Sequence, residues 1–175
     1  MLFVLDRDGV INVESDAFIK SPDEWVPIAN SIKAIAQLSQ AGHRVVVATN
    51  QSGVNRKLLS LDTLTLIHQK MIDVIEAAGG KIEKIYFCPH LPDENCECRK
   101  PKPGLLHEIH RDFQVPFKEM IVVGDSLRDL QAGELLGCQL VLVKTGNGKK
   151  TLSQLDQTFD VKVYDDLLAA VEVLK

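Results

Sequence analysis

Long hydrophobic runs are absent from this sequence of 175 residues, and none approaches the roughly 20 residues of a membrane-spanning helix. No basic segment of the kind that begins a secretory signal precedes the first apolar residues. Positive charge is not in excess, since 20 basic and 24 acidic residues give a net charge of −4. This balance gives no electrostatic basis for binding nucleic acid or an anionic membrane. We therefore expect a cytoplasmic, monomeric protein that binds neither.

Cysteine is scarce too, with four residues, but three of them lie within eleven positions. Without an export signal, this clustering favours metal binding over disulfide bonds. Cys88, His90, Cys96 and Cys98 supply three sulfur ligands and one nitrogen ligand, the set of a closed structural Zn²⁺ site. The alternative is a group of free buried cysteines. Cys138 stands apart, before an apolar run, and is expected in the core.

Short β-branched runs alternate with amphipathic segments along the chain. The pattern predicts strands at 2–5, 44–48, 82–87, 120–123, 140–143 and 161–164. It predicts helices at 28–41, 60–78, 104–113 and 126–135, with a last one beginning at 167. Apolar strands that alternate with helices are typical of an α/β fold, in which a mainly parallel sheet is covered on both faces. No change in composition marks a boundary, so we expect residues 1–175 to form one domain.

Polar residues follow four of these expected strands. In open α/β sheets, ligands bind outside the carboxyl ends of the strands. We therefore expect these polar side chains to meet at one edge of the sheet. They are Asp6 and Asp8, Thr49 and Asn50, Cys88 and His90, and Asp125 and Ser126.

The segment Asp-Arg-Asp-Gly at 6–9 directly follows the first expected strand, and Gly9 allows a turn that brings both aspartates toward one pocket. Asp125 would add a third carboxylate, and such oxygens suit Mg²⁺. A cation and a lysine would offset the repulsion between a carboxylate and a phosphate. Asp6 could then form an aspartyl-phosphate, while Asp8 exchanges protons with the leaving group and water. Taken alone, however, Asp-x-Asp-Gly is also common in solvated turns.

Four motifs, in this order, resemble those of the haloacid dehalogenase (HAD) superfamily. They are Asp-Arg-Asp-Gly-Val-Ile at 6–11, Thr-Asn-Gln-Ser-Gly at 49–53, Arg-Lys-Pro at 99–101 and Gly-Asp-Ser-x-x-Asp at 124–129. The resemblance implies a three-layer Rossmann-like HAD fold. It makes Asp6 the nucleophile, Asp8 the general acid and base, Thr49 a phosphoryl hydrogen-bond donor and Lys100 the balancing charge. Mg²⁺ would be held by Asp6, Asp125 and the backbone carbonyl of Asp8.

Two assignments stay open within these motifs. Lys102 is a rival for the lysine role, although the family pattern favours the lysine directly after Cys-Arg, which is Lys100. Asp129 would either orient the site from behind or be an exposed helix carboxylate.

The pattern Cys-Pro-His…Cys-x-Cys-Arg-Lys-Pro at 88–101 narrows the resemblance. It is similar to the D-glycero-D-manno-heptose-1,7-bisphosphate 7-phosphatases and the related histidinol-phosphate phosphatases. Asn12 and Ser52 are closer to the heptose enzymes, which act in the synthesis of lipopolysaccharide core or surface glycans. The resemblance thus implies removal of the C7 phosphate of a heptose bisphosphate. The alternatives are a histidinol-phosphate or other sugar-phosphate phosphatase, and a non-catalytic zinc-stabilised binding protein.

The same resemblance implies contacts to a small phosphorylated sugar from Glu14, Asp16, Asn50, Gln51, Ser52, Arg99 and Ser126. Arg56 is a candidate for a second phosphate, or else a solvated arginine. Two departures from the family, Ser126 in place of lysine and Arg-Lys-Leu at 56–58, bear on the exact sugar rather than on the reaction.

The segments around the expected pocket are short. No cap domain fits, so residues 12–28 form at most a flap. Its Trp25 packs the flap onto the body or covers the sugar. The zinc loop leads into Arg99 and Lys100 and would hold both in place.

Overall fold

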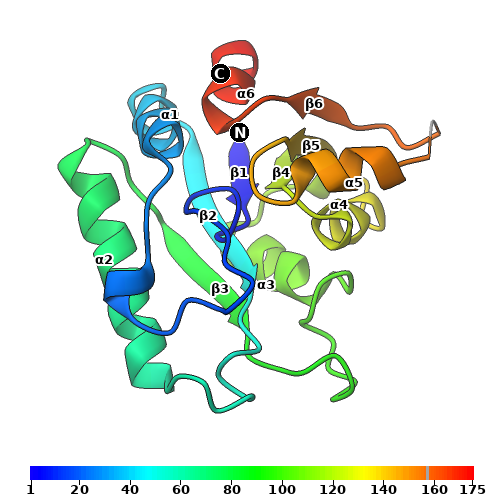
Figure 1. The fold of residues 1–175 in the computed structure, drawn as a ribbon. Helices are drawn as coiled ribbons and strands as arrows, with labels where there is room; N and C mark the ends of the chain where they lie inside the picture. The colour runs from blue at the N-terminus through cyan, green and yellow to red at the C-terminus, as the bar shows by residue number, and fades with distance from the viewer. Residues whose placement is uncertain (157) are drawn as a thin grey trace.

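The fold was analysed in a computed structural model that describes residues 1–156 and 158–175. Its sheet has the strand order β3-β2-β1-β4-β5-β6, and every neighbouring pair is parallel (Figure 1). The strands are β1 (Leu2–Leu5), β2 (Arg44–Asn50), β3 (Lys84–Cys88), β4 (Met120–Gly124), β5 (Gln139–Val143) and β6 (Lys162–Tyr164). All six were expected, and none of their ends lies more than two residues from the expected position.

Helices cover both faces of the sheet, as expected. Helices α1 (Ala29–Gln40), α2 (Leu61–Ala77) and α6 (Leu167–Leu174) pack on one face, and α3 (Gly104–Phe113) and α4 (Leu127–Glu134) on the other. The sequence did not predict α5 (Gly148–Gln154) or the 3₁₀ turns at Pro22–Glu24 and Phe117–Glu119. Helix α5 buries only a glycine and a threonine, so it has no apolar stripe for periodicity to detect.

The central strand β1 explains why an unbroken apolar run fits this fold. Phe3 and Leu5 project toward α1, α2 and α6, whereas Leu2 and Val4 project toward α3 and α4. All four side chains are at most 2% exposed. Alternate residues of a strand face opposite sides, so a strand with helices on both sides must be apolar at every position.

The N-terminal flap, residues 12–28, runs from the end of β1 to α1. Its two ends meet in a bridge between Asn12 and Pro27. Trp25 is 1% exposed and packs in the core that lies beneath α1 and α2. The Lys70 amine of α2 donates hydrogen bonds to the carbonyls of Pro22 and Trp25, at 2.7 and 3.1 Å. Trp25 therefore anchors the flap to the body and does not cover the pocket.

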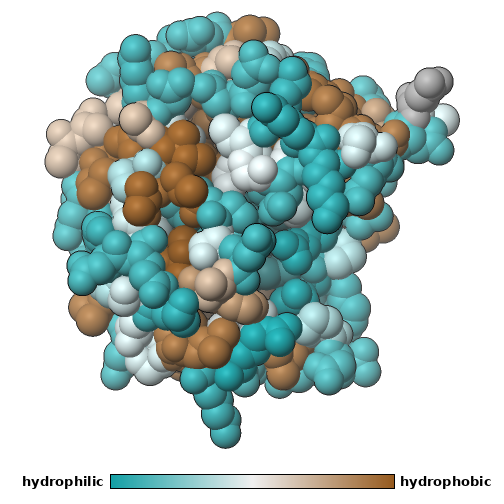
Figure 2. All heavy atoms as spheres, in the orientation of Figure 1, coloured by the Kyte–Doolittle hydropathy of each residue, from teal (hydrophilic) through white to brown (hydrophobic). Residues whose placement is uncertain are grey.

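The surface is consistent with the net charge of the chain. Figure 2 shows one face, where hydrophobic patches are interrupted by hydrophilic side chains. Among the described residues, no helix combines the length and the apolar character that a membrane crossing requires.

Replacing Trp25 tests the anchoring of the flap. Trp25→Ala removes a fully buried ring and should lower the free energy of unfolding by about 3–5 kcal/mol. The control Val26→Ala truncates a neighbour that is 51% exposed and should change it by less than about 0.5 kcal/mol. Urea denaturation measures both free energies. Circular dichroism is the signal to follow, because Trp25 is the single tryptophan of the chain and the Trp25→Ala variant has no tryptophan fluorescence. A loss below about 1 kcal/mol for Trp25→Ala would contradict the anchoring.

Candidate active site

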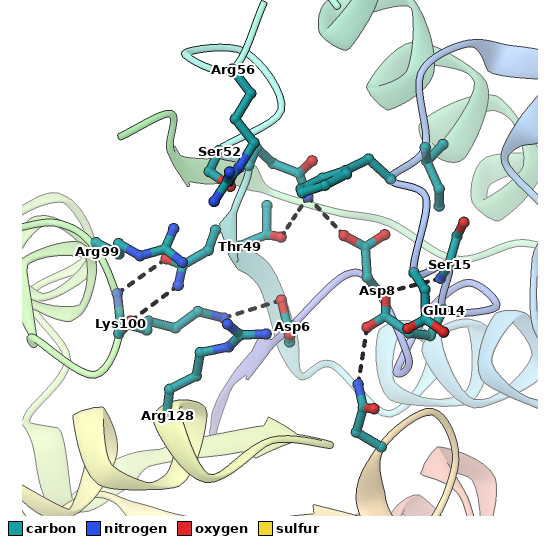
Figure 3. A pocket seen from close by; sticks show the side chains of 16 residues that line it. Asp6, Asp8, Glu14, Ser15, Thr49, Ser52, Arg56, Arg99, Lys100 and Arg128 are labelled. Atoms are coloured by element: carbon teal, nitrogen blue, oxygen red, sulfur yellow. Dashed lines mark hydrogen bonds and ion pairs between the residues drawn. The ribbon is translucent and has the colours of Figure 1, made fainter. Parts of the chain in front are cut away.

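A pocket of about 300 Å³ lies where the carboxyl ends of β1 and β2 meet the flap (Figure 3). Parallel strands place their carboxyl ends at the same edge, which is why separate segments converge here. Every expected catalytic and substrate-contact residue lines the pocket except Ser126. The lining consists of Asp6, Asp8, Glu14, Ser15, Asp16, Phe18, Ile19, Thr49, Asn50, Gln51, Ser52, Arg56, Arg99, Lys100, Arg128 and Asn147.

Lys100 places a positive charge next to Asp6. Its amine lies 3.1 Å from Asp6 Oδ1 and 2.6 Å from Asp129 Oδ1, and it donates to the carbonyl of Ala48 at 2.7 Å. Burial opposes the charge on Lys100, but Asp129 and Asp6 raise its pKa above the ordinary value. Lys102 instead pairs with Glu97 at the surface. Of the two lysines, it is Lys100 that forms ion pairs with Asp6 and Asp129.

Three carboxylates crowd behind the pocket. Oxygens of Asp6, Asp125 and Asp129 all lie within 4.8 Å of one another. Burial, together with the charge of Asp129, raises the pKa of Asp6 to about 7. Burial and the charges of Asp6 and Asp129 raise the pKa of Asp125 to about 8. One buried lysine faces three carboxylates, so a divalent cation would balance the charge that remains.

Two glycines leave the space that the Asp125 carboxylate occupies. A Cβ atom at Gly9 or at Gly146 would overlap the Asp125 carboxylate, and both glycines have positive φ values, +80° and +53°. The backbone N–H of Asn147 donates to Asp125 Oδ2 at 2.8 Å, and the Thr151 hydroxyl donates to the Asp125 carbonyl at 2.7 Å. The donor set and this cradle fit a hard cation with oxygen ligands.

Asp8 has a different environment, rich in hydrogen-bond donors. Arg7 donates to both of its carboxylate oxygens, at 2.9–3.1 Å, and Asn12 and Gln51 each donate at 2.9 Å. Burial alone would raise the pKa of Asp8, but the Arg7 charge and these hydrogen bonds bring it below the ordinary value. Two aspartates separated by one residue thus have pKa values shifted in opposite directions, because Asp6 is buried among carboxylates and Asp8 among hydrogen-bond donors.

Ser126, which was expected to contact substrate, lies outside the residues that line the pocket. Its hydroxyl and its backbone N–H both donate to Asp129 Oδ2, at 2.6 and 3.1 Å, at the start of α4. Asp129, left open between two roles, is 1% exposed and holds Lys100 from behind. The hydroxyl of Ser126 thus helps to hold the Asp129 carboxylate in place.

Three arginines also line the pocket. Arg56 follows β2, Arg99 ends the cysteine loop, and Arg128 lies in the first turn of α4 (Figure 3). Burial, and then the charges of Arg128 and Arg56, lower the pKa of Arg99. Like charges that converge in this way favour an anionic ligand between them.

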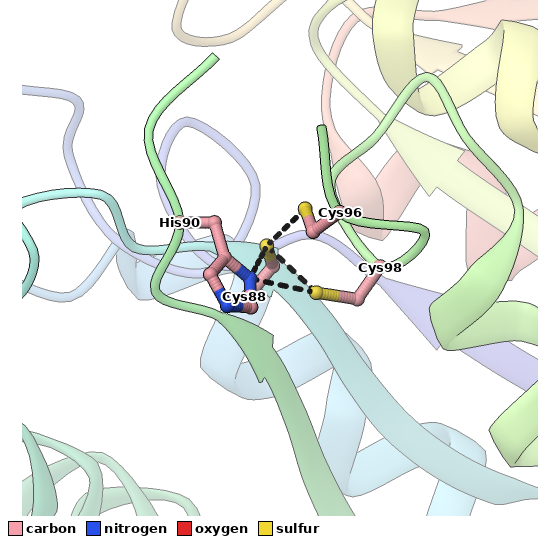
Figure 4. Close-up of side chains that lie close together, drawn as sticks. All are labelled: Cys88, His90, Cys96 and Cys98. Atoms are coloured by element: carbon pink, nitrogen blue, oxygen red, sulfur yellow. Dashed lines mark hydrogen bonds between the residues drawn. The ribbon is translucent and has the colours of Figure 1, made fainter. Parts of the chain in front are cut away.

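The predicted zinc ligands come together at the end of β3 (Figure 4). Cys88 Sγ lies 3.3 Å from His90 Nδ1, 3.6 Å from Cys96 Sγ and 2.9 Å from Cys98 Sγ, and His90 Nδ1 lies 3.2 Å from Cys98 Sγ. Tetrahedral Zn²⁺ with Zn–S bonds of about 2.3 Å would separate its sulfur ligands by about 3.8 Å. The cluster is therefore compatible with a four-coordinate zinc site. Cys138 lies apart in the core, as expected.

This cluster is joined directly to the pocket. Burial opposes ionisation of the Cys96 thiol, but a hydrogen bond from the backbone of Arg99 lowers its pKa. The Arg99 guanidinium also donates to the carbonyl of His90 at 3.1 Å. Next along the chain, the backbone N–H of Lys100 donates to Asn50 Oδ1 at 3.0 Å. The loop thus holds Arg99 by both its backbone and its guanidinium, and it places Lys100 at the end of β2.

The chain is similar in sequence to known proteins. Residues 97–170 match the model of the HAD-hydrolase-like family. The chain is 50% identical to the D-glycero-beta-D-manno-heptose-1,7-bisphosphate 7-phosphatase of Bordetella bronchiseptica over 173 residues, 99% of this chain and 97% of the relative. The protein of the same name from Neisseria meningitidis is 51% identical over 169 residues, 95% of this chain and 90% of the relative. The chain belongs to this family of HAD-type phosphatases.

Solved structures of this phosphatase family have the same fold. The D,D-heptose 1,7-bisphosphate phosphatase from B. bronchiseptica, complexed with magnesium and phosphate, superposes with a TM-score of 0.95 at 50% identity, covering 98% of this chain and 96% of that one. The corresponding enzyme from Burkholderia thailandensis superposes with a TM-score of 0.78 at 44% identity, covering 98% and 96%. The family resemblance predicted from the motifs is confirmed, and the chain is a phosphoester hydrolase.

Sequence reasoning about this phosphatase missed several residues around the site, among them Arg128, Asn147 and Arg7. Arg128 sits within the motif Gly-Asp-Ser-x-Arg-Asp, where its position on the first turn of a helix after β4 was the available signal. Asn147 belongs to a Gly-Asn-Gly segment that follows β5, and the end of this strand faces the same edge as the other polar ends. Arg7 was read only as a spacer between two aspartates.

Arg7 is the least expected of the three, because its side chain is buried. Its guanidinium lies between Asp8 and His68 of α2, with Nη1 3.3 Å from His68 Nε2. Burial and the Arg7 charge lower the pKa of His68 to about 3, so this imidazole is neutral and accepts a hydrogen bond. Arg7 therefore fixes the orientation of the Asp8 carboxylate from within the core.

Removal of Arg7 tests its role in this phosphatase. Arg7→Met leaves the Asp8 carboxylate without its balancing charge, so we expect a loss of about 3 kcal/mol in the free energy of unfolding. Because Asp8 also loses its orientation, kcat should fall about tenfold or more. The control Arg111→Met removes an arginine whose side chain is 71% exposed. Urea denaturation and steady-state phosphate release measure both effects, and an Arg7→Met variant that behaves like the control would contradict this role.

Proposed function

We propose that the chain removes the C7 phosphate of D-glycero-β-D-manno-heptose 1,7-bisphosphate. One observation carries the proposal: the pocket holds Lys100 beside Asp6 and, in addition, the three arginines Arg56, Arg99 and Arg128. A substrate with two phosphates would place the reacting one at Lys100 and the other among the arginines. The β configuration is proposed because the relatives from Bordetella and Neisseria bear it in their names.

Mg²⁺ fits the carboxylate site. We propose that it is held by Asp6, Asp125 and the backbone carbonyl of Asp8. When bound, the cation would offset the repulsion between the Asp6 carboxylate and the phosphate dianion. The magnesium and phosphate in the B. bronchiseptica structure support this assignment, as does the crowding of three carboxylates around one lysine.

The residues of the chain would carry out the reaction in two steps. An Asp6 oxygen attacks the phosphorus, the bond between phosphorus and the C7 oxygen breaks, and Asp8 in its protonated form gives its proton to that oxygen. Asp8 then takes a proton from water, whose oxygen attacks the phosphorus and releases phosphate from Asp6. Lys100 would bind the phosphoryl oxygens throughout, and the Thr49 hydroxyl, at the end of β2, would donate to one of them.

The remaining lining residues would bind the sugar. Glu14 and Asp16 of the flap and Asn50, Gln51 and Ser52 after β2 offer donors and acceptors for hydroxyl groups. Two carboxylates do not suit a phosphate, but they accept hydrogen bonds from hydroxyls. We propose that residues 1–175 act as one catalytic domain in which the flap and the cysteine loop replace a cap.

Histidinol phosphate fits this pocket less well. It has a single phosphate, so it would leave the three arginines without an anion. A non-catalytic binding protein would have no need for Asp6, Asp8 and Lys100 arranged around one position.

A substrate comparison tests the proposal. The value of kcat/KM for the β-heptose bisphosphate should exceed that for histidinol phosphate by at least about 100-fold, because the latter leaves the arginine cluster without an anion. Chelation of the metal should abolish activity and added Mg²⁺ should restore it, whereas Asp6→Asn should stay inactive in both conditions. A preference for histidinol phosphate would refute the substrate, and full activity of Asp6→Asn would refute the mechanism.

We also propose that Zn²⁺ binds Cys88, His90, Cys96 and Cys98 in a structural role. Four ligands would close the coordination sphere, which leaves no position for substrate or water. The two hydrogen bonds from Arg99 to this cluster mean that the metal would keep Arg99 and Lys100 aligned with the pocket.

The variant Cys96→Ser tests the role of zinc. Loss of one thiolate should lower bound zinc below about a tenth of the wild-type content and reduce kcat/KM at least about tenfold, since Arg99 loses its attachment. Cys138→Ala, outside the cluster, should keep zinc and activity. Metal analysis and kinetics on the same preparations give both values. A zinc-free Cys96→Ser enzyme with full activity would rule out the alignment role.

A further inference from the structure

Phe18 is an unusual residue in the pocket. It is an aromatic side chain among mostly polar lining residues and it is 37% exposed, so it contributes little to the core. Its backbone is left-handed, with φ of +63°, which is rare for a bulky residue other than glycine. A strained backbone that presents an exposed ring is not explained by stability, and such strain is concentrated at functional sites.

The ring of Phe18 packs against one particular group. The guanidinium carbon of Arg56 lies 5.5 Å from the centre of the Phe18 ring, within the range of a cation–π interaction. On its other side, Arg56 Nε donates to the hydroxyl of Ser52 at 3.3 Å. In Figure 3 the Arg56 side chain extends toward Ser52 and Arg99. An exposed arginine is thus held at two points and directed into the pocket.

Both loops around this contact are shaped for it. The flap turn that carries Phe18 is tied by the Lys20 amine, which donates to the carbonyls of Ala17 and Phe18 at 2.9 and 3.4 Å. On the opposite side, a Cβ atom at Gly53 would overlap Leu59 and would lie at an ordinary contact distance, 3.6 Å, from the Phe18 ring. The loop after β2 therefore lies directly beside the flap at Phe18.

We propose that Phe18 is a positioning residue that holds Arg56 against the phosphate distal to the reacting one. The proposal rests on the proposed function, because it assumes a substrate with two phosphates. The flap would then contribute to specificity without touching the reacting phosphoryl group: it restrains a long, flexible side chain before substrate arrives. Restraint of this kind reduces the entropy lost on binding. It should therefore appear in KM and leave kcat largely unchanged.

The test compares two substrates, the heptose 1,7-bisphosphate and the heptose 7-phosphate, which lacks the distal phosphate. Phe18→Leu should raise KM for the bisphosphate about two- to fivefold, the equivalent of one exposed cation–π interaction, with kcat unchanged. Phe18→Tyr keeps an aromatic face and should behave like wild type. Arg56→Gln should raise the same KM about tenfold. None of these variants should change KM for the 7-phosphate.

A double variant separates positioning from simple packing. If Phe18 acts through Arg56, then Phe18→Leu combined with Arg56→Gln should be no worse than Arg56→Gln alone. Lys57→Gln is the matched control: it removes one positive charge at the next residue, which does not line the pocket, and KM should stay at the wild-type value. Thermal unfolding of each variant should match wild type.

The outcomes distinguish the two proposals. If wild-type enzyme shows no preference for the bisphosphate over the 7-phosphate, the proposed substrate fails and this inference fails with it. If the preference is present but Phe18→Leu leaves KM unchanged, or raises KM equally for both substrates, or adds fully to Arg56→Gln, the positioning role alone is overturned.

Discussion

The buried charge around Lys100 is the constraint on which the rest of the site depends. Three carboxylates would repel one another strongly in the interior, and one lysine reduces that repulsion without removing it. Such an arrangement is tolerated because its neighbours are fixed: Asp129 by Ser126, Asp125 by the backbone of Asn147, and Lys100 by the carbonyl of Ala48. The site therefore keeps a place for a divalent cation and an anion at the expense of stability.

The parallel sheet makes this concentration of charge possible. Strands β1, β2 and β4 lie side by side at the centre of the sheet, and all three end at the same edge. Each supplies a short polar segment to that edge while its own residues are buried on both faces. The apolar body is thus separate from the polar chemistry, and changes in the loops can alter specificity without disturbing the core.

Two short loops take the place of a cap over this open pocket. The cysteine cluster orients Arg99, and the flap, anchored by Trp25, brings Phe18 toward Arg56. Neither loop has enough apolar surface to be rigid by itself. One contains the cluster of three cysteines and a histidine, and the other is held by a buried tryptophan and the hydrogen bonds of Lys70. The flap and the cysteine loop, which border the pocket, are therefore each held in place by local contacts.

The sequence by itself determined the order of strands and helices along the chain, the two aspartates after β1 and the cluster of three cysteines and a histidine. These are carried by local patterns: apolar periodicity, close spacing and motif order. Only the tertiary structure decided which partner each polar group takes. Arg7 turned inward to Asp8, Ser126 turned to Asp129, and Asn147 and Arg128 entered the pocket from segments read as ordinary loop and helix. Such pairings depend on distances between residues far apart in the chain, and on which face of a helix is buried, and neither is encoded in a local pattern.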